Sequence, residues 1–203
     1  ALFVVLLQTP QSQAQTLMCS AIAAQDFTMV PDAPTQIMRT TDVPAADPLP
    51  PYCRIEGYVA TSIGFEVRIP QSNWNGKLLM QGCGGFCGSY AVIAQCDDAL
   101  ARGYACVSTD LGHKSTPIDG KWAYNNPQGE IDFYYRATHA TAQAAKAIVA
   151  VAMRQDIEKS YFRGCSTGGR QGLISAQRFP NDFDGIIAAA PAGVSPGGGL
   201  HLI

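Results

Sequence analysis

A serine flanked by glycines is the residue of this chain best suited to nucleophilic chemistry. Ser166 lies in Gly164-Cys165-Ser166-Thr167-Gly168, after a strand-like run at residues 161–164 and before a helix-like segment at residues 169–178. In a G-x-S-x-G turn between strand and helix, glycine permits the tight bend, and the serine oxygen is held out at the carboxyl end of a sheet. The pattern predicts that Ser166 is the nucleophile of an acyl-transfer reaction. The alternative is a glycine-rich turn in an ordinary α/β protein.

An acyl-transfer site also needs hydrogen-bond donors for the oxyanion that forms when a carbonyl group is attacked. The backbone N–H of Thr167, at the start of the helix-like segment, is one candidate. A second donor normally comes from a loop at the end of an earlier strand. The glycine-rich stretch at residues 81–88 follows the apolar residues 78–80 and has the composition for that role. We therefore predict an oxyanion hole formed by the N–H of Thr167 and that of Gly84 or Gly85.

The same glycine-rich loop is also similar to a dinucleotide-binding turn. Gly82 and Gly84 follow a strand-like run, and Asp110 closes the next such run, as the acidic residue of a Rossmann unit would. Cys87, however, stands where the third glycine or an alanine is required. A dinucleotide site also needs a helix that begins inside the loop. The start of the first helix after Gly82 therefore distinguishes the two interpretations.

Three histidines are present that might be considered as the base that activates a serine. His113 lies in the Asp110–Lys114 loop at a strand end, and we expect it to be structural or to line the substrate site. His139 lies within a predicted helix, where a surface or core role is the simplest one. His201 is among the last residues of the chain. None of the three is expected to be the catalytic base.

Aromatic residues cluster between positions 122 and 135, and such clusters more often form core and loop packing than ligand cages. We assign no site role to this cluster, which comprises Trp122, Tyr124, Phe133, Tyr134 and Tyr135. No group of His, Asp and Cys residues has the spacing of a zinc site. The sequence therefore predicts neither a metal nor a cofactor within this chain.

The elements that must position Ser166 alternate between strand-like and helical patterns. Apolar runs near residues 78–80, 104–107, 161–164 and 185–190 are separated by predicted helices near 93–101, 132–155 and 169–178. This alternation is typical of βαβ units, and it predicts an α/β fold with a mostly parallel sheet. Alternating apolar residues from Ile55 to Ile69 predict an antiparallel hairpin at the N-terminal edge of that sheet. Residues 31–51, rich in Pro, Asp and Ala, indicate an extended surface segment rather than helix or strand.

Composition favours one globular domain without a nucleic-acid surface. The 203 residues carry a net charge of -2, and the Lys and Arg residues are scattered singly, so no basic stripe is present that could follow a phosphate backbone.

The apolar run at residues 1–7 and the small polar residues after it resemble the remnant of a signal peptide over residues 1–16, a buried strand being the alternative. This run is far below the ~20 residues that span a membrane, and no other stretch is apolar enough. Residues 17–203 then form the one globular domain.

Seven cysteines in a chain of this size indicate disulfides and an oxidising compartment, so we expect a secreted or periplasmic protein. Cys19 and Cys53, which flank the extended segment, are the pair expected to be bonded. Four others are expected near one strand end: Cys83, Cys87, Cys96 and Cys106. Among these four the pairing is open, and a bond between Cys87 and Cys96 is preferred. The count is odd, and Cys165 is the cysteine expected to lack a partner within this chain.

Several stretches carry a family resemblance. They are Cys53-Arg54-Ile55-Glu56-Gly57, Trp74-Asn75-Gly76-Lys77, the loop at 82–88, Asp110-Leu111-Gly112-His113-Lys114, Gly164-Cys165-Ser166-Thr167-Gly168-Gly169-Arg170-Gln171 and Phe183-Asp184-Gly185-Ile186-Ile187-Ala188-Ala189-Ala190-Pro191-Ala192. Together they resemble the tannase and feruloyl esterase family. The resemblance runs from about Cys53 to Ala192, and its most specific part is the stretch at residues 165–171.

The resemblance implies that residues 17–203 are one partial catalytic domain, an α/β-hydrolase core with a lid inserted downstream of the nucleophile. It implies hydrolysis of esters of aromatic acids, such as gallate, ferulate or mono(hydroxyethyl) terephthalate, through an acyl-enzyme, with a small aromatic ester as the partner rather than nucleic acid or a membrane. It also implies that the catalytic Asp and His, and the cysteine that bonds the one at position 165, lie beyond Ile203, so that this chain alone is inactive. A calcium site, where the family has one, belongs to the lid. A non-catalytic hydrolase-like module is the second hypothesis.

Overall fold

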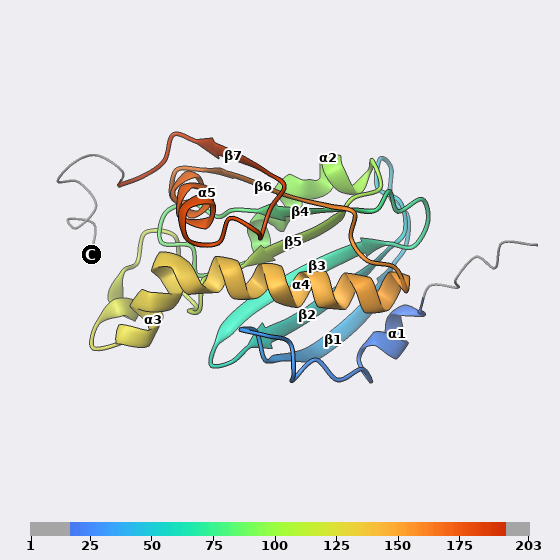
Figure 1. The fold of residues 1–203 in the computed structure, drawn as a ribbon, viewed down its shortest axis with the longest axis horizontal. Coiled ribbons are helices and arrows are strands. Elements are labelled where there is room, and N and C mark those ends of the chain that lie inside the picture. The colour runs from blue at the N-terminus through green and yellow to red at the C-terminus, as the bar shows by residue number, and fades with distance from the viewer. Residues whose placement is uncertain (1–16, 194–203) are drawn as a thin grey trace, which may run out of the picture.

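A computed structural model describes residues 17–193 of the chain. The signal-peptide remnant predicted at residues 1–16 and His201 therefore lie outside the described residues. Within them, seven strands form one mixed sheet in the order β1-β2-β3-β5-β4-β6-β7 (Figure 1). The strands are β1 (Thr35–Val43), β2 (Tyr52–Val59), β3 (Ile63–Pro70), β4 (Lys77–Gln81), β5 (Ala105–Thr109), β6 (Lys159–Cys165) and β7 (Gly185–Ala189).

Helices alternate with the strands of the C-terminal half, as the sequence predicted. The α-helices are α1 (Cys19–Ile22), α2 (Asp97–Leu100), α3 (Pro127–Ile131), α4 (Ala137–Met153) and α5 (Thr167–Arg178). Shorter helical turns are η1 (Ala91–Cys96), η2 (Lys121–Ala123) and η3 (Asp132–Arg136). The long helix α4 lies across one face of the sheet, and α5 lies beside β6 and β7 (Figure 1).

The sheet is covered by an apolar core on each face. Side chains of neighbouring strand residues point to opposite faces, and in β4 the residues Leu78 and Met80 belong to one buried cluster while Leu79 belongs to the other. The larger cluster includes Ile148 of α4, and the smaller one includes Leu100 of α2. Helix α4 and the η1–α2 segment therefore cover opposite faces.

Strands β1, β2 and β3 pair antiparallel, and strands β4, β5, β6 and β7 run parallel to one another. The predicted hairpin is present, because β2 pairs antiparallel with β3 from Tyr52↔Pro70 to Val59↔Ile63. Strand β3 then pairs antiparallel with β5, whereas the pairs β4–β5, β4–β6 and β6–β7 are parallel. The carboxyl ends of β4 and β6 therefore meet at one edge of the sheet.

The prediction that residues 31–51 contain neither helix nor strand was wrong, because β1 lies inside this segment and pairs antiparallel with β2. The outer edge of β2 needs backbone hydrogen-bond partners, and β1 supplies them despite its polar side chains. β1 is itself an edge strand whose residues are mostly half-buried or exposed. Because so few of its side chains are buried, β1 carries little of the apolar alternation that identifies strands in a sequence.

The predicted helix at residues 132–155 begins with a turn of different geometry. Residues Asp132–Arg136 form a π-helical turn, and the α-helix proper runs from Ala137 to Met153. Buried Asp132 accepts hydrogen bonds from Gln128 (3.0 Å) and Arg136 (2.7 Å), which fix this turn. A π-turn shifts the following side chains around the helix axis and is frequent at functional sites.

Three disulfides join the described cysteines, and Cys165 is left unpaired and exposed. The predicted bond between Cys19 and Cys53 is present. The preferred bond between Cys87 and Cys96 was wrong, because the bonds are Cys83–Cys87 and Cys96–Cys106. Cys87 packs in the core under α4, whereas Cys96 packs in the core on the other face, so the sheet separates them.

An ion pair fastens α4 to the loop between α5 and β7. His139 of α4 donates a hydrogen bond from Nδ1 to Oδ2 of buried Asp182 (2.8 Å), and its ring stacks on Phe179 at 3.9 Å. Its Nε2 lies 3.7 Å from the exposed carboxylate of Asp32, and Lys146 donates to the carbonyl oxygen of Asp182. The hydrogen bond to Asp182 is the main reason that the pKa of His139 is raised above its ordinary value.

We predict that this contact makes stability depend on pH as pH rises above the unfolded histidine pKa of about 6.5. A histidine whose pKa is raised on folding stabilises the folded state fully below its unfolded pKa, about 6.5, and loses that contribution as pH rises through the folded pKa. Thermal unfolding of a protein containing this chain should therefore show that His139→Gln lowers Tm more at pH 6 than at pH 9. Asp32→Asn is the control, since its exposed carboxylate should contribute little at either pH. An equal Tm loss at both pH values would contradict this assignment.

Candidate active site

Ser166 occupies the turn between β6 and α5 with a backbone conformation rare for a non-glycine residue. Its φ is 58° and its ψ is -118°. Its N–H donates to the carbonyl oxygen of Ala189 (3.1 Å), and its carbonyl oxygen accepts from the N–H of Arg170 (3.1 Å) and of Ala192 (2.9 Å). Such strain costs on the order of 1–3 kcal/mol and persists only where the surroundings fix the backbone. The expected strand-turn-helix context is therefore present.

Two glycines near Ser166, one in the motif and one directly after it, are required by close backbone contacts. A Cβ at Gly164 would lie 2.5 Å from the carbonyl carbon and oxygen of Gly168. A Cβ at Gly169 would lie 2.3 Å from the carbonyl oxygen of Ala189. Any larger residue at these positions would open the turn that presents Ser166.

The glycine-rich loop after β4 lies directly against this turn. A Cβ at Gly82 would lie 2.9 Å from Cα of Gly168, so the two backbones are in contact. Thr167 Oγ1 donates to the carbonyl oxygen of Gly85 (2.7 Å), and Gln171 Oε1 accepts from the N–H of Cys83 (3.2 Å). Helix α5 therefore holds the loop through side chains one turn apart.

The loop leaves two backbone donors available among the described residues. The N–H of Cys83 donates to Gln171, and the N–H of Phe86 donates to the carbonyl oxygen of Pro117 (2.8 Å). The N–H groups of Gly84 and Gly85 between them have no acceptor within residues 17–193. Gly85 has φ +59°, and a Cβ there would lie 2.3 Å from the oxygen of Pro117, so this bend requires glycine. Gly85, one of the two predicted loop donors, is thus in contact with Thr167, the first residue of α5.

The structure does not support the dinucleotide interpretation. The first helical turn after Gly82 is η1, which begins only at Ala91, so no helix starts inside the loop. Asp110 is completely buried, pairs with Lys114 at 2.6 Å and accepts from the N–H groups of Gly64 (2.9 Å) and Gly112 (2.8 Å). A carboxylate engaged in this way cannot reach a ribose.

A cavity of about 190 Å³ opens next to Ser166. It is lined by Gly85, Phe86, Pro117, Phe133, Tyr134, Ser166, Thr167, Arg170, Ala192 and Gly193. The guanidinium of Arg170 lies over the rings of Phe133 (4.4 Å) and Tyr134 (5.0 Å). Three aromatic rings, those of Phe86, Phe133 and Tyr134, thus contribute to the walls, and Ser166 and Thr167 also line the cavity.

Phe133 and Tyr134 belong to the aromatic cluster to which the sequence analysis gave no site role. The structure corrects this for both, because the π-turn η3 carries them into the cavity wall. Trp122 remains a packing residue that contacts Phe133 at 4.9 Å. Tyr124 is exposed, and Tyr135 lies under Arg178. Periodicity alone cannot separate these roles, since it is the π-turn that sets the direction of the side chains.

His113 is structural, as one of the two expected roles had it. Its Nε2 lies 2.7 Å from the carbonyl oxygen of Phe86, which can only accept, so this nitrogen carries the proton. Its ring stacks on Trp122 at 3.9 Å, and burial lowers its pKa. His139 is engaged by Asp182. Neither histidine is available as a base for Ser166.

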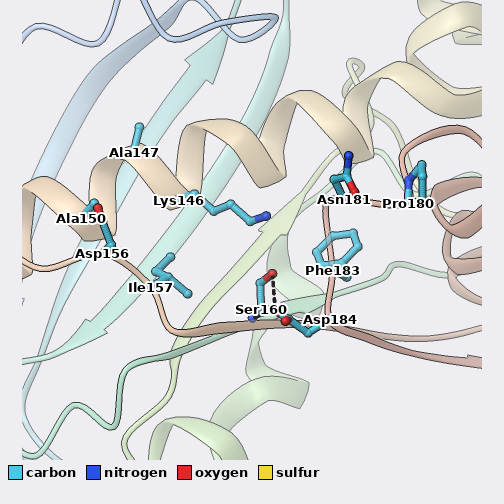
Figure 2. A pocket seen from close by; sticks show the side chains of 10 residues that line it. All are labelled: Lys146, Ala147, Ala150, Asp156, Ile157, Ser160, Pro180, Asn181, Phe183 and Asp184. Atoms are coloured by element: carbon cyan, nitrogen blue, oxygen red, sulfur yellow. Dashed lines mark hydrogen bonds between the residues drawn. The ribbon is translucent and has the colours of Figure 1, made fainter.

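A larger cavity of about 630 Å³ lies at the opposite ends of β6 and β7 (Figure 2). Its walls include Lys146, Ser160 and Asp184. Ser160 Oγ donates to the carbonyl oxygen of Asp182 (2.9 Å), so it is engaged as a structural donor. This cavity is at the wrong end of the strands for Ser166, which follows the last residue of β6.

Neither a metal site nor a membrane span emerges from the described part of the chain. Residues 17–193 contain no group of three or more His, Cys, Asp or Glu side chains that could hold a metal ion. None of their helices has both the length and the apolar character needed to cross a membrane. The calcium site expected for the lid remains an expectation about residues outside this chain.

Comparisons with known proteins identify close relatives. The chain is 38% identical to an uncharacterized esterase of Xanthomonas campestris pv. campestris over 87% of its own length and 33% of the relative's. It is 36% identical to the mono(2-hydroxyethyl) terephthalate hydrolase of Piscinibacter sakaiensis over 77% of its own length and 29% of the relative's. The chain thus spans about a third of the length of the curated relatives it matches.

Solved structures agree with the sequence comparisons. The crystal structure of feruloyl esterase B from Aspergillus oryzae superposes with a TM-score of 0.75 at 33% identity, over 88% of this chain and 38% of that one. The mixed sheet with helices on both faces is thus part of the α/β-hydrolase core that the sequence predicted. The profile of "Tannase and feruloyl esterase" matches residues 50–194. This chain therefore belongs to the tannase and feruloyl esterase family.

Proposed function

We propose that the protein containing this chain is a serine carboxylic-ester hydrolase that cleaves esters of aromatic acids. The observation that carries the proposal is the strained turn at Ser166, with φ 58° and ψ -118°, beside two loop donors that have no acceptor within residues 17–193. In serine hydrolases such a turn presents the nucleophile next to the oxyanion hole. The family assignment supports the same chemistry.

The reaction follows from the groups at the turn. The oxygen Oγ of Ser166 attacks the ester carbonyl carbon while a histidine base takes its proton, and the C=O electrons move onto the oxygen. The N–H of Thr167 and of Gly84 or Gly85 stabilises this oxyanion. Collapse of the tetrahedral intermediate expels the alcohol, which receives the proton, and water then releases the acid from the acyl-enzyme. The base and its orienting Asp are expected outside residues 17–193.

The cavity walls support an aromatic acid as the acyl group. Phe86, Phe133, Tyr134 and Pro117 form apolar surfaces on which a planar ring can pack, and cavities for such ligands are mostly apolar with few polar groups. The relatives point the same way, since one is a feruloyl esterase and another a mono(2-hydroxyethyl) terephthalate hydrolase. We therefore propose feruloyl, galloyl or terephthaloyl esters as the substrate class.

The disulfides support a location outside the reducing cytosol. Three bonds within one small domain are typical of secreted or periplasmic proteins. We propose that the protein acts in such a compartment.

Replacing Ser166 tests the nucleophile directly. We predict that Ser166→Ala lowers kcat on methyl ferulate or a p-nitrophenyl ester by roughly 10³-fold or more, because the hydroxyl that forms the acyl-enzyme is lost. Circular dichroism should show unchanged folding, since the side chain lies at an exposed turn. Retention of a tenth of the wild-type kcat would place the nucleophile elsewhere.

A second prediction concerns the base. The 203 residues alone should show no Ser166-dependent turnover near 1 s⁻¹, because His113 and His139 are engaged by Phe86 and Asp182. Without a base, the oxyanion donors alone leave a residual rate of roughly 10³ to 10⁴ over water. The assay compares the purified chain with its Ser166→Ala variant. Enzymatic turnover by the chain alone would show that a base lies within it.

A further inference from the structure

Arg163 lies behind the candidate site, at the point where two strands separate. It pairs with Gln81 across the parallel ladder between β6 and β4. The N–H of Gly82 donates to the carbonyl oxygen of Arg163 (2.8 Å). Beyond this bond β4 turns into the glycine-rich loop and β6 continues to Ser166. The relative position of the two chains is therefore set here.

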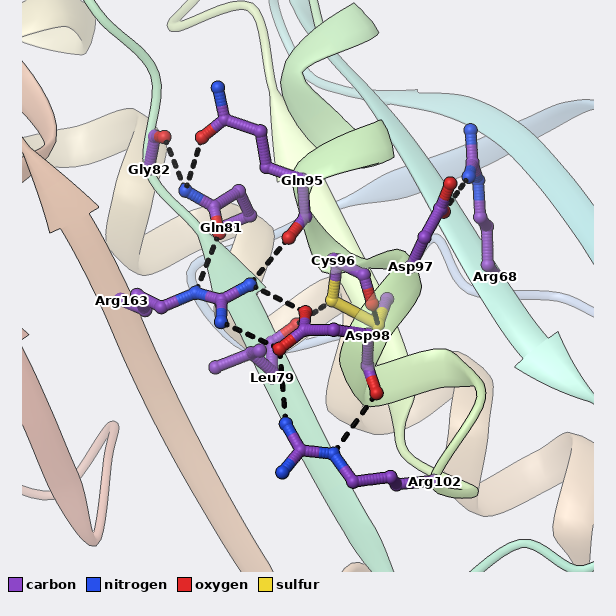
Figure 3. A network of polar contacts seen from close by, with 11 residues as sticks. Arg68, Leu79, Gln81, Gly82, Gln95, Cys96, Asp97, Asp98, Arg102 and Arg163 are labelled. Carbon is purple, nitrogen blue, oxygen red and sulfur yellow. Dashed lines mark hydrogen bonds and ion pairs between the residues drawn. A yellow bond between two sulfur atoms is a disulfide. The ribbon is translucent and has the colours of Figure 1, made fainter. Parts of the chain in front are cut away.

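The guanidinium of Arg163 is held by four hydrogen bonds (Figure 3). Nη1 and Nη2 donate to the carboxylate of Asp98 at 3.1 and 3.0 Å, and Nη2 also donates to the carbonyl oxygen of Gln95 at 2.5 Å. The third side of the planar group, Nε, donates to Oε1 of Gln81 at 3.0 Å. The bond to Arg163 is the main reason that the pKa of Asp98 is lowered, so this partner stays ionised.

Arg163 thereby fixes the orientation of the Gln81 amide. Gln81 is only 4% exposed, and its Oε1 accepts from Arg163, so its Nε2 points the other way. Nε2 donates to the carbonyl oxygen of Gly82 (3.1 Å) and to Oε1 of Gln95 (3.3 Å). The peptide that opens the glycine-rich loop is therefore held through Gln81 by a charged fork whose geometry is rigid.

A rotation of the peptide group at Gly82 cannot be accommodated within the glycine-rich loop alone. A Cβ at Gly82 would lie 2.8 Å from Cζ of Phe162 and 2.9 Å from Cα of Gly168, so Gly82 is in close contact with both β6 and the Ser166 turn. Only one residue separates Gly82 from Gly84. A change at Gly82 would therefore move the loop donors relative to Thr167.

We propose that Arg163 is a positioning residue that sets the distance between the two oxyanion donors without contacting the substrate. This inference rests on the proposed function. The competing explanation is a half-exposed ion pair between Arg163 and Asp98, which would contribute little. The two differ in one respect. An ion pair needs only a positive charge, whereas the positioning role needs the planar fork that joins Asp98, Gln95 and Gln81.

The experiment compares Arg163→Gln and Arg163→Lys with Arg102→Gln in the complete protein. Arg102 also pairs with Asp98 (3.0 Å) but does not contact Gln81, so it is a matched control. Each variant is assayed for kcat and KM on a p-nitrophenyl ester. Its affinity for phenylboronic acid is also measured. Boron bonds to Ser166 Oγ, whose proton passes to the base, and the resulting tetrahedral anion occupies the oxyanion hole without turnover.

We expect Arg163→Gln to lower kcat and boronate affinity together by roughly 10- to 100-fold, with KM within about twofold of wild type, because a misplaced donor weakens binding of the transition state only. Arg163→Lys should behave like Arg163→Gln, and Arg102→Gln like wild type. Gln81→Met should reproduce the loss. If Arg163→Gln does not fold, Gln81→Met and Arg163→Lys carry the test. The double variant Arg163→Gln, Gln81→Met should lose little more kcat and boronate affinity than either single variant.

The inference is overturned if Arg163→Gln keeps wild-type kcat and boronate affinity, if lysine restores both, or if Arg102→Gln loses as much. A change confined to KM or Tm would overturn it as well. These outcomes occur in an active enzyme and leave the proposed function intact. A wild-type protein with neither Ser166-dependent turnover nor Ser166-dependent boronate binding would instead refute the proposed function, and this inference with it.

Discussion

The close approach of two backbone turns is the constraint on which the candidate site depends. Gly82, just after β4, and Gly164, near the end of β6, both lie against Gly168: a Cβ at Gly82 would lie 2.9 Å from Cα of Gly168, and a Cβ at Gly164 would lie 2.5 Å from its carbonyl group. Ser166 is bent to φ 58° within this contact, and the cost of that strain must be offset by the surrounding packing. The parallel ladder between β4 and β6 and helix α5 hold the two sides together.

The remaining elements keep that contact in place. The core under α4 supports the loop side, where the Cys83–Cys87 bond closes the glycine-rich loop on itself. On the other face, the Cys96–Cys106 bond ties η1 to β5. The same η1–α2 segment provides Asp98, which anchors Arg163. Both faces of the sheet therefore act on the separation between the loop and the Ser166 turn, although only one face carries the cavity.

Local patterns were sufficient to predict the turn at Ser166, the glycine-rich loop and most strands, because glycine requirements and apolar periodicity are properties of short segments. The errors arose where contacts between residues distant in sequence determine the local structure. Strand β1 is polar and exists because β2 has an open edge. Cys87 and Cys96 lie on opposite faces, which spacing along the chain does not reveal. Phe133 reaches the cavity through a π-turn, and the contacts of Arg163 join three segments distant in sequence: β6, β4 and the η1–α2 segment.

The central claim is that Ser166 is an activated nucleophile, and covalent labelling tests it most directly. A complete protein containing this chain is treated with a fluorophosphonate, which phosphonylates only an activated serine, and the modified peptide is located by mass spectrometry. The account predicts one label, on the peptide that contains Ser166, with esterase activity lost in proportion to labelling. Labelling at another serine, or full activity after stoichiometric labelling of Ser166, would contradict it.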